Sequence, residues 1–483
     1  MKKGKLVFVP APLMGHLIPA VQLAKLLLHL NYNLSITVLT VKPPEDARIN
    51  AYIDSLAAAA ATTTSRIKFI SLSQSYPEVD VLKFLTNLPQ TVGPLVKEVV
   101  ANIVEQSNSV PNAPRLAGFV LDSLLTCLVE LANEFGVPSY AFYTSGAGSL
   151  GFHLYARALH DEKKIEFGQI KDSDTKFTVP SYANQVSIKL FPAVLLQPES
   201  FTSFSNSIKW MREVKGILIN TFSELESHAV DSLSKDELQI PPIYPVGPIL
   251  NLEGSSNVHQ NYDTIMQWLD EQPRSSVVFL CFGSMGCFST DQVKEIAYAL
   301  EQSGHRFLWS LRGPGEQVKD LMYGVTDYEN EAEVLPEGFI DRTVGIGKVV
   351  GWAPQAAILG HNATAGFVSH CGWNSTLEGI WFGVPMVAWP LYGEQRLNAL
   401  TLVKELGLAV ELKIDYKIDD GEVEIVKAEK IEKGIRWLME HDNDVRERMK
   451  KMEKESKKAL MDNGGSSHIM LNRFINDIMN NMS

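Results

Sequence analysis

The sequence has few cysteines, no long apolar run and no excess of positive charge. Its 483 residues include four scattered cysteines, Cys127, Cys281, Cys287 and Cys371, which argues against a disulfide framework or a zinc site. No uninterrupted run of about 18 apolar residues occurs, so we expect no membrane-spanning helix. The formal net charge is −12, which would repel a nucleic acid or an anionic membrane surface on average. We therefore expect neither as a partner.

We also expect no secretory signal. Basic residues precede the apolar run 6–9, but Pro10, Pro12 and His16 interrupt the continuation of that run. The apolar core of a signal peptide would be too short. We expect a cytoplasmic protein.

The composition and the periodicity of the first half indicate large α/β domains. Hydrophobic residues make up 45% and charged residues 21%, as in ordinary globular proteins. The length allows two large domains or roughly three average ones. Short apolar runs alternate with segments of helical periodicity, which predicts a parallel sheet covered by helices. The expected strands are 6–10, 35–41, 116–121 and 138–143, with helices from about Leu17 and from Ser123 to Phe135.

The second half repeats the alternation. A strand is expected over 277–282, and Ser289 to Gln292 is typical of a capping box that opens a helix. That helix should stop at Gly304, and a further strand should cover 306–311. The segment 241–260 is rich in Pro, Gly, Ser and Asn and lacks periodicity, which predicts a linker and a domain boundary near residue 250.

The densest group of polar and aromatic residues lies between Trp352 and Gln395. Within it, a strand over 367–369 leads to Gly372, which allows a tight turn, and Asn374 is a suitable N-cap for a helix that follows. A helix N-terminus at the carboxyl end of a strand binds anions, because free backbone N–H groups and the helix dipole point at the ligand. The segment therefore predicts an anion site.

Side chains around this turn suit a phosphate next to a diol. Ser375 and His370 add hydrogen-bond donors, and Glu378 lies on the same helix face as Asn374 and Ser375. The Glu378 carboxylate could bind ribose hydroxyls, and Trp352 could stack on an aromatic base.

The first half offers a histidine and a carboxylate at strand ends. His16 follows the first strand, and Asp122 ends the strand 116–121, so both could meet at one edge of the sheet. A histidine held by an aspartate through one ring nitrogen presents the other as a general base. The alternative, in which His16 is only a neighbour of a helix N-cap and Asp122 is a separate cap, remains open at this point.

The 44 residues from Trp352 to Gln395 resemble, over their whole length, the box with which plant family-1 UDP-sugar glycosyltransferases bind the nucleotide sugar. The likeness extends to 12–19 and 335–339. It implies the α/β GT-B fold, with two Rossmann-like domains facing one cleft. The implied domains are an acceptor-binding domain, 1–249, joined by the C-terminal helix 464–483, and a nucleotide-sugar domain, 250–463.

The resemblance also implies roles for single residues. His16 would deprotonate the acceptor hydroxyl, with Asp122 as its partner. The implied donor site comprises Trp352, Ala353, Gln355 and Glu378 at the base and ribose, Ser284, His370, Asn374 and Ser375 at the diphosphate, Trp373, Glu394 and Gln395 at the sugar, and Thr144 near the sugar or phosphate.

The expected reaction is therefore glucosyl transfer from UDP-glucose in one step, with inversion at the anomeric carbon and without a metal ion or cofactor. Gln395, rather than histidine, resembles the glucose-using members of the family. Apolar candidates for the acceptor pocket suggest a lipophilic phenolic, flavonoid, stilbenoid or terpenoid acceptor. These candidates are Leu13, Met14, Phe142, Phe288 and Tyr392. We expect a monomer.

Two other functions are compatible with two nucleotide-binding-like halves. One is a catalytically silent nucleotide-sugar binder, against which the presence of both His16 and Asp122 argues. The other is a nicotinamide-dependent dehydrogenase, but 11–16 lacks the G-x-G-x-x-G spacing of that class. A glycosidase is disfavoured as well, because we identify no convincing pair of carboxylates.

Overall fold

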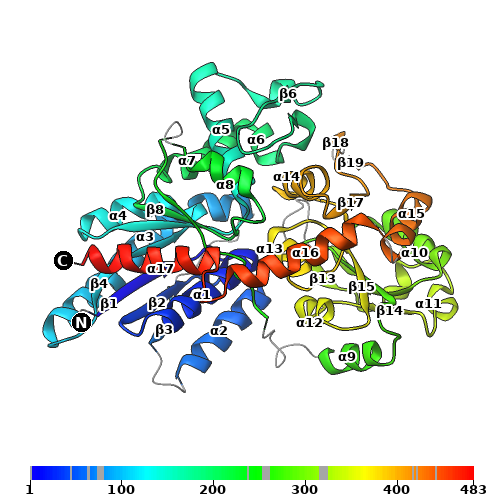
Figure 1. The fold of residues 1–483 in the computed structure, drawn as a ribbon, viewed down its shortest axis with the longest axis horizontal. Helices are drawn as coiled ribbons and strands as arrows, with labels where there is room; N and C mark the ends of the chain where they lie inside the picture. The colour runs from blue at the N-terminus through cyan, green and yellow to red at the C-terminus, as the bar shows by residue number, and fades with distance from the viewer. Residues whose placement is uncertain are drawn as a thin grey trace. The chain divides into compact units, whose positions relative to one another are not determined.

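The apolar runs form two parallel sheets, one in each half of the chain (Figure 1). The structure is a computed structural model that describes residues 3–43, 46–61, 66–72, 81–235, 239–252, 261–314, 325–415, 418–419, 422–440 and 443–482. Part of the expected linker, 253–260, lies outside the described residues.

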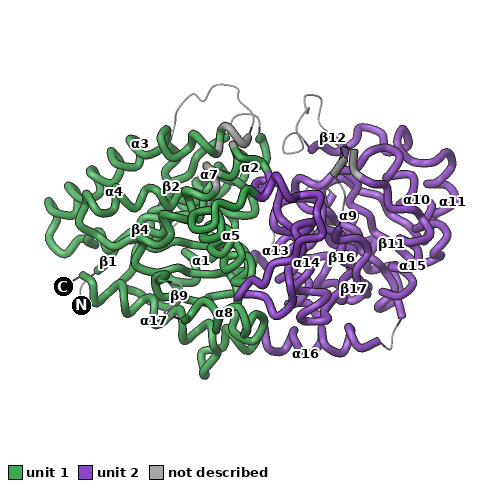
Figure 2. The backbone as a smooth tube through the Cα atoms, turned by 90° about the horizontal axis from the view of Figure 1, so that it is seen from above, with its two compact units in different colours: residues 1–166, 197–250, 458–483 green, residues 167–196, 251–457 purple. Residues whose placement is uncertain are grey.

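The chain divides into two compact units, coloured separately in Figure 2. Unit 1 comprises 1–166, 197–250 and 458–483, and unit 2 comprises 167–196 and 251–457. The expected division at 249/250 differs from these units in two segments. Residues 167–196 belong to unit 2 because Glu405 accepts hydrogen bonds from the backbone N–H groups of Ala183 and Asn184. Residues 458–463 belong to unit 1, where Leu460 packs against the core.

Unit 1 contains a seven-stranded sheet in the order β3-β2-β1-β4-β5-β8-β9. All its neighbouring strands are parallel. The strands are β1 (Gly4–Val9), β2 (Leu34–Thr40), β3 (Ile67–Ser71), β4 (Arg115–Asp122), β5 (Ser139–Tyr143), β8 (Gly216–Ile219) and β9 (Ile243–Pro245). The helices are α1 (Met14–Leu30), α2 (Ala47–Ala61), α3 (Val81–Ser109), α4 (Val129–Glu134), α5 (Ala147–Lys163), α7 (Pro198–Trp210), α8 (Ser227–Leu233) and α17 (Ser466–Asn480).

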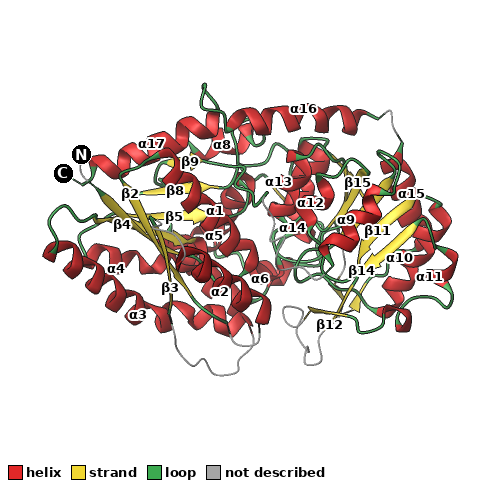
Figure 3. Cartoon of the chain, turned by 90° about the horizontal axis from the view of Figure 1, so that it is seen from below, coloured by secondary structure: helices red, strands yellow, loops and turns green. Residues whose placement is uncertain are grey.

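Helices cover both faces of this sheet (Figure 3). Side chains alternate along β1, so that Leu6 and Phe8 pack with α1 and α17 on one face. Val7 and Val9 pack with α3 and α4 on the other. Burial on both faces explains why β1 is a continuous apolar run rather than an alternating one. The C-terminal helix α17 thus completes the core of the unit in which the chain begins.

Unit 2 contains a six-stranded parallel sheet in the order β14-β11-β10-β15-β16-β17. Its strands are β10 (Val277–Cys281), β11 (Arg306–Ser310), β14 (Gly347–Val350), β15 (Thr364–Ser369), β16 (Met386–Ala388) and β17 (Ala409–Glu411). Its longer helices are α9 (Tyr262–Asp270), α10 (Thr290–Ser303), α13 (Trp373–Trp381), α15 (Ala428–Met439) and α16 (Asp444–Ala459). Shorter elements are α6 (Ala193–Leu196), α11 (Phe339–Arg342), α12 (Gln355–Leu359), α14 (Gln395–Leu400) and the hairpin of β12 (Arg312–Pro314) and β13 (Val325–Asp327).

Two local predictions need correction. The segment after β4 is a 3₁₀ helix, Ser123–Leu128, before it becomes α4, since Leu125, with φ of −116° and ψ of 17°, interrupts the helical backbone. Ser289 does cap α10, but Gln292 does not complete the capping box. The Gln292 side chain instead exchanges two hydrogen bonds with the backbone of Val426.

Among the described residues, no helix combines the length and the apolarity needed to cross a membrane.

Candidate functional site

In unit 1 the strand order reverses between β1 and β4. The chain runs from β1 to β2 and β3 on one side and returns to β4 on the other. Ligands of open α/β sheets bind beyond the carboxyl ends of the strands at such a reversal. β1 and β4 are paired in register up to Val9 and Leu121. The first titratable side chains beyond these two positions are those of His16, in the first turn of α1, and Asp122, the last residue of β4.

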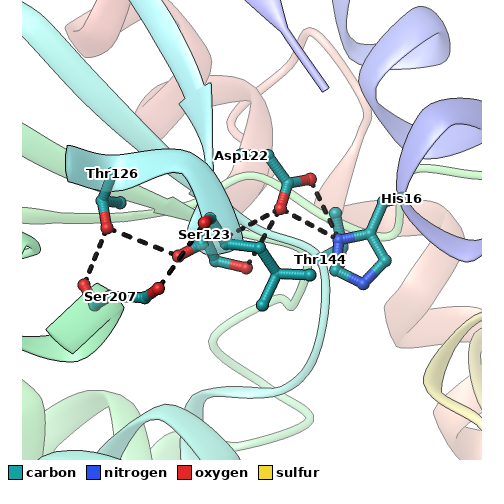
Figure 4. A network of polar contacts seen from close by, with 7 residues as sticks. His16, Asp122, Ser123, Thr126, Thr144 and Ser207 are labelled. Atoms are coloured by element: carbon teal, nitrogen blue, oxygen red, sulfur yellow. Dashed lines mark hydrogen bonds and ion pairs between the residues drawn. The ribbon is translucent and has the colours of Figure 1, made fainter. Parts of the chain in front are cut away.

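His16 and Asp122 form a hydrogen-bonded pair (Figure 4). His16 Nδ1 lies 2.9 Å from Oδ2 and 3.1 Å from Oδ1 of Asp122. The Asp122 side chain is 1% exposed, whereas that of His16 is 23% exposed. A carboxylate only accepts hydrogen bonds, so Nδ1 carries the shared proton and Nε2 is the basic nitrogen of the neutral ring. This geometry can serve a general base.

Neighbouring residues hold the pair in place. Asp122 Oδ1 also accepts from Leu124 N at 2.9 Å, which fixes the carboxylate at the start of the 3₁₀ helix. Thr144, which follows β5, places Oγ1 3.4 Å from His16 Nδ1, so it contacts the His16–Asp122 pair within unit 1. Thr126 donates to the carbonyls of Ser207 and Ser123 and ties this turn to α7, as Figure 4 shows.

In unit 2 the order reverses between β10 and β15. β15 ends at Ser369, and α13 begins four residues later at Trp373. Cys371 has φ of 60°, a left-handed conformation, which turns the chain toward α13. The predicted N-cap, Asn374, is wrong, because Gly372 occupies the N-cap position and Asn374 lies in the first turn. Gly372 has no side chain, and no side-chain hydrogen bond caps the start of α13.

His370 is buried beside this turn. Burial lowers the pKa of His370 to about 4, against a smaller opposite effect from the backbone of Cys281. The ring is therefore neutral at pH 7. Its Nδ1 has no hydrogen-bond partner among the described residues. A methyl group on Gly283 would lie 2.5 Å from His370 Nε2, and one on Gly372 would collide with the same atom. Both turns need glycine because the imidazole packs between them.

Gln355 joins two other predicted site residues. Its Nε2 donates to Ser375 Oγ at 2.8 Å and to Glu378 Oε2 at 2.7 Å, so α12 and α13 present these side chains together. Glu378 is partly exposed, but burial still raises the pKa of its carboxyl to about 7, and the Gln355 hydrogen bond lowers it by less. Two other predicted site residues, Ala353 just before α12 and Trp373 at the start of α13, are buried, with exposed fractions of 7% and 4%.

The end of the predicted segment is fixed by Gln395. Its Oε1 accepts from the backbone N–H groups of Leu391 and Tyr392, at 2.8 and 3.0 Å. Because the carbonyl oxygen holds this turn, the amide Nε2 is the group with which Gln395 can contact a ligand. Glu394 is partly exposed and occupies the N-cap position of α14.

Sequence reasoning missed Arg312. This residue follows β11 and is 5% exposed. Its guanidinium donates to the carbonyl of Ser284 at 2.8 Å and lies 5.2 Å from the ring centroid of Trp352. A charged residue directly after an apolar strand was the available signal. One predicted acceptor-pocket residue, Phe142, is instead 1% exposed and belongs to the core of unit 1.

Two Rossmann-like sheets, one with an uncapped helix N-terminus and one with a His–Asp pair, define a nucleotide-dependent α/β enzyme. The family model described as "UDP-glucoronosyl and UDP-glucosyl transferase" matches residues 223–424. The UDP-glucose flavonoid 3-O-glucosyltransferase 6 of Fragaria ananassa is 49% identical over 99% of both chains. The anthocyanidin 3-O-glucosyltransferase 1 of Manihot esculenta is 50% identical over 96% of this chain and 100% of its own.

Solved structures agree. A transferase from Siraitia grosvenorii in complex with UDP is 45% identical with a TM-score of 0.86, over 99% of this chain and 100% of its own. UGT71G1 of Medicago truncatula, in complex with UDP-glucose, is 38% identical with a TM-score of 0.85, over 99% and 98%. The chain belongs to the UDP-glycosyltransferase family. The predicted family and enzyme class, and the α/β GT-B fold with two Rossmann-like domains, are confirmed.

Proposed function

We propose that this enzyme transfers glucose from UDP-glucose to a hydroxyl group of a small lipophilic acceptor, with inversion at the anomeric carbon. The hydrogen-bonded pair of His16 and Asp122 carries this proposal. The names of the two curated relatives, a flavonoid and an anthocyanidin 3-O-glucosyltransferase, favour a flavonoid-type acceptor.

His16 is the general base of the proposed reaction. Its Nε2 takes the proton of the acceptor hydroxyl while the acceptor oxygen forms a bond to the anomeric carbon. The bond between that carbon and the UDP oxygen breaks in the same step, and UDP leaves with the electron pair. Asp122 holds Nδ1 and stabilises the imidazolium that forms. Such a base contributes about 10²–10⁴ to the rate.

The donor is assigned to the turns of unit 2. Trp352 stacks on uracil beside Ala353, and Gln355 and Glu378 bind the ribose. Gln355 already orients Glu378 through a hydrogen bond of 2.7 Å.

The other predicted donor-site residues are assigned to the diphosphate and to the sugar. The backbone N–H groups that start α13, Ser375 Oγ and His370 Nδ1 bind the diphosphate, and the buried Nδ1 gains the partner that it lacks among the described residues. Further contacts to the donor are assigned to Ser284 and Asn374 for the diphosphate, to Trp373, Glu394 and Gln395 for the sugar, and to Thr144 near the sugar or phosphate.

No metal ion is required in this proposal, because hydrogen-bond donors and a helix N-terminus of unit 2 meet the charge of the departing UDP. Among the described residues, no three His, Cys, Asp or Glu side chains gather as metal ligands. We expect glucosyl transfer to continue at an undiminished rate in excess chelator. Loss of transfer that returns on adding Mg²⁺ or Mn²⁺ would contradict this part.

The decisive experiment incubates the enzyme with UDP-glucose and a panel of flavonols, stilbenes and terpenoid alcohols, and detects the added hexose by mass. We expect a β-linked glucoside of at least one flavonol. His16→Ala should lose transfer about 10²–10⁴-fold while its affinity for UDP stays unchanged. Tight UDP-glucose binding without transfer to any acceptor would instead indicate a silent nucleotide-sugar binder. Transfer at the full rate by His16→Ala would refute the role of the base.

A further inference from the structure

Arg312 connects three parts of the donor unit. Its Nη1 donates to the carbonyl of Ser284, in the turn after β10, and its Nε donates to Asp327 Oδ1 at 3.1 Å. Its Nη2 donates to the carbonyl of Val325 at 2.5 Å. The same guanidinium lies over the indole of Trp352. One side chain therefore touches the turn proposed for the diphosphate and the ring proposed for the base.

Asp327 contacts both Arg312 and the backbone of Trp352. Its Oδ1 pairs with Arg312, and its Oδ2 accepts from the backbone N–H of Trp352 at 3.2 Å. The Arg312 side chain is 4% exposed, whereas that of Asp327 is 51% exposed. Solvent screens the charge of the half-exposed Asp327 carboxylate. That carboxylate therefore cancels only part of the positive potential around the buried Arg312 guanidinium. The positive charge of Arg312 is felt at Cys287, which follows the Ser284 turn. Burial raises the pKa of the Cys287 thiol, and the Arg312 charge lowers it by less.

A buried arginine is costly unless its donors are satisfied. An apolar residue could fill the same space without that cost, so packing alone does not account for Arg312. The planar guanidinium can stack on an aromatic ring and form several directed hydrogen bonds at once, which lysine cannot do.

We propose that Arg312 is a positioning residue for the nucleotide sugar. Its guanidinium contacts the indole of Trp352 and holds the ring in the orientation in which it stacks on uracil. Its bond to the Ser284 carbonyl fixes the phosphate turn, and its charge attracts the diphosphate. This inference rests on the proposed function, because it takes Trp352 as the ring on which the base stacks.

Calorimetric titration with uridine, UDP and UDP-glucose tests the proposal. Arg312→Met should weaken UDP binding roughly 10- to 100-fold, the loss of one or two charge-assisted interactions. Uridine, which has no phosphate, should bind about threefold to tenfold more weakly, because only the ring support is lost. Arg312→Lys keeps the positive charge but not the planar guanidinium. Compared with Arg312→Met, it should therefore regain most of the UDP affinity and little of the uridine affinity.

Arg446→Met is the matched control. Arg446 is a partly buried arginine of unit 2 that, like Arg312, donates to two backbone carbonyls, in its case those of Ala365 and Leu438. It should lower the melting temperature without changing any of the three affinities. Asp327→Ala removes the half-exposed brace and keeps the proposal testable if Arg312→Met does not fold. It should weaken uridine binding about threefold, the effect of one modest hydrogen bond.

The outcomes separate this inference from the proposed function. If Trp352→Ala weakens uridine binding but Arg312→Met and Asp327→Ala do not, the positioning role of Arg312 is wrong and the base site stands. If Trp352→Ala leaves uridine binding unchanged, the proposed base site itself is wrong. If Arg312→Met and Arg446→Met lower the melting temperature alike and neither changes an affinity, Arg312 is only structural.

Discussion

The strand order reverses between β1 and β4 in unit 1 and between β10 and β15 in unit 2, and a histidine lies shortly beyond a strand end at each reversal. In unit 1 the strand after the reversal ends in Asp122, whose carboxylate caps the following 3₁₀ helix and holds His16. In unit 2 the equivalent strand leads to Gly372, which leaves the start of α13 without a side-chain cap. The same topology thus presents a carboxylate in one unit and a helix N-terminus without a side-chain cap in the other.

A second helix of unit 1 strengthens the contrast. The N-terminus of α5 is occupied by Glu226, whose carboxylate accepts from Ala147 N at 2.8 Å and Gly148 N at 2.9 Å. Carboxylates at these N-termini compete with any anionic ligand. The histidines differ as well, since His16 is paired with a carboxylate and His370 is buried and neutral at pH 7. Unit 1 is therefore suited to proton transfer, and unit 2 to binding an anion.

The largest expected effect comes from Asp122→Asn, which removes the charge that distinguishes unit 1. The amide can still accept from Leu124 N, but it no longer stabilises a His16 imidazolium or favours the proton on Nδ1. We expect kcat to fall about 10²–10⁴-fold, the full contribution of a general base. UDP affinity should not change. Steady-state kinetics and UDP titration measure both quantities, with Asp54→Asn, an exposed partner of Lys42, as the control. A normal kcat would show that Asp122 is only a helix cap.

Asn374→Asp tests the contrast from the other side, because it adds a carboxylate to the first turn of α13. The two side chains have nearly the same shape, and a negative charge there stabilises the helix. At about 5 Å from a phosphate and an effective dielectric constant of about 20, the repulsion is about 3 kcal/mol. UDP-glucose should then bind roughly 100-fold more weakly, while the melting temperature does not fall.

Asn443→Asp is the control for this change. Asn443 Oδ1 accepts from Arg446 N at the start of α16, so the substitution adds the same charge to another helix N-terminus of the unit. UDP-glucose affinity should not change in that variant. Equal affinity in Asn374→Asp and the unaltered protein would place the diphosphate elsewhere.

The sequence predicts the elements of both reversals but not all of their contacts. The apolar runs and the glycine and proline positions locate β1, β4, β10 and β15, since buried parallel strands have a clear pattern. The likeness of the segment from Trp352 to Gln395 is the basis for the proposed donor residues. The N-cap position of α13 was missed because Asn374 is a better cap by residue type, and the left-handed turn at Cys371 is set by its tertiary surroundings.

Long-range contacts were the least predictable part. The bond between His16 and Asp122 joins residues 106 positions apart, and only the parallel topology makes it plausible from sequence. Arg312 has no local pattern that points to Trp352 or Ser284, because both contacts depend on how the loops after β10, β11 and β14 converge. The packing of 167–196 against the rest of unit 2 likewise depends on Arg396 and Glu405, which lie about 200 residues further along the chain.

A smaller effect is expected from Gly283→Ala compared with Gly136→Ala. Gly283 has φ of 78° and Gly136 has φ of 66°, so alanine costs about 1–2 kcal/mol of stability at either position. A methyl group at Gly136 meets no atom within 4 Å, whereas at Gly283 it meets the His370 ring. Only Gly283→Ala should displace His370 and weaken UDP binding, by about tenfold for one lost hydrogen bond. Urea unfolding and UDP titration of both variants measure the two effects. Equal UDP affinities would mean that His370 does not contact the diphosphate.

The smallest effect concerns pH and Glu378. Burial raises the pKa of this carboxyl to about 7, whereas His370, with a pKa of about 4, stays neutral in the same range. If ribose hydroxyls bind the ionised carboxylate, affinity for UDP-glucose should rise about fourfold from pH 6.5 to 8, as the ionised fraction grows. The free energy of unfolding should move in the opposite direction. The folded protein holds this proton more tightly than the unfolded chain, so stability falls as the pH rises from about 4.5 to 7.

Glu378→Gln isolates this effect, because the amide keeps the size of the side chain and does not titrate. Its affinity for UDP-glucose should be lower and independent of pH over the same range, and its stability should lose the corresponding slope. UDP-glucose is the better ligand here, because UDP has a terminal phosphate that itself titrates near neutral pH. A pH dependence that persists in Glu378→Gln would assign the titration to another group.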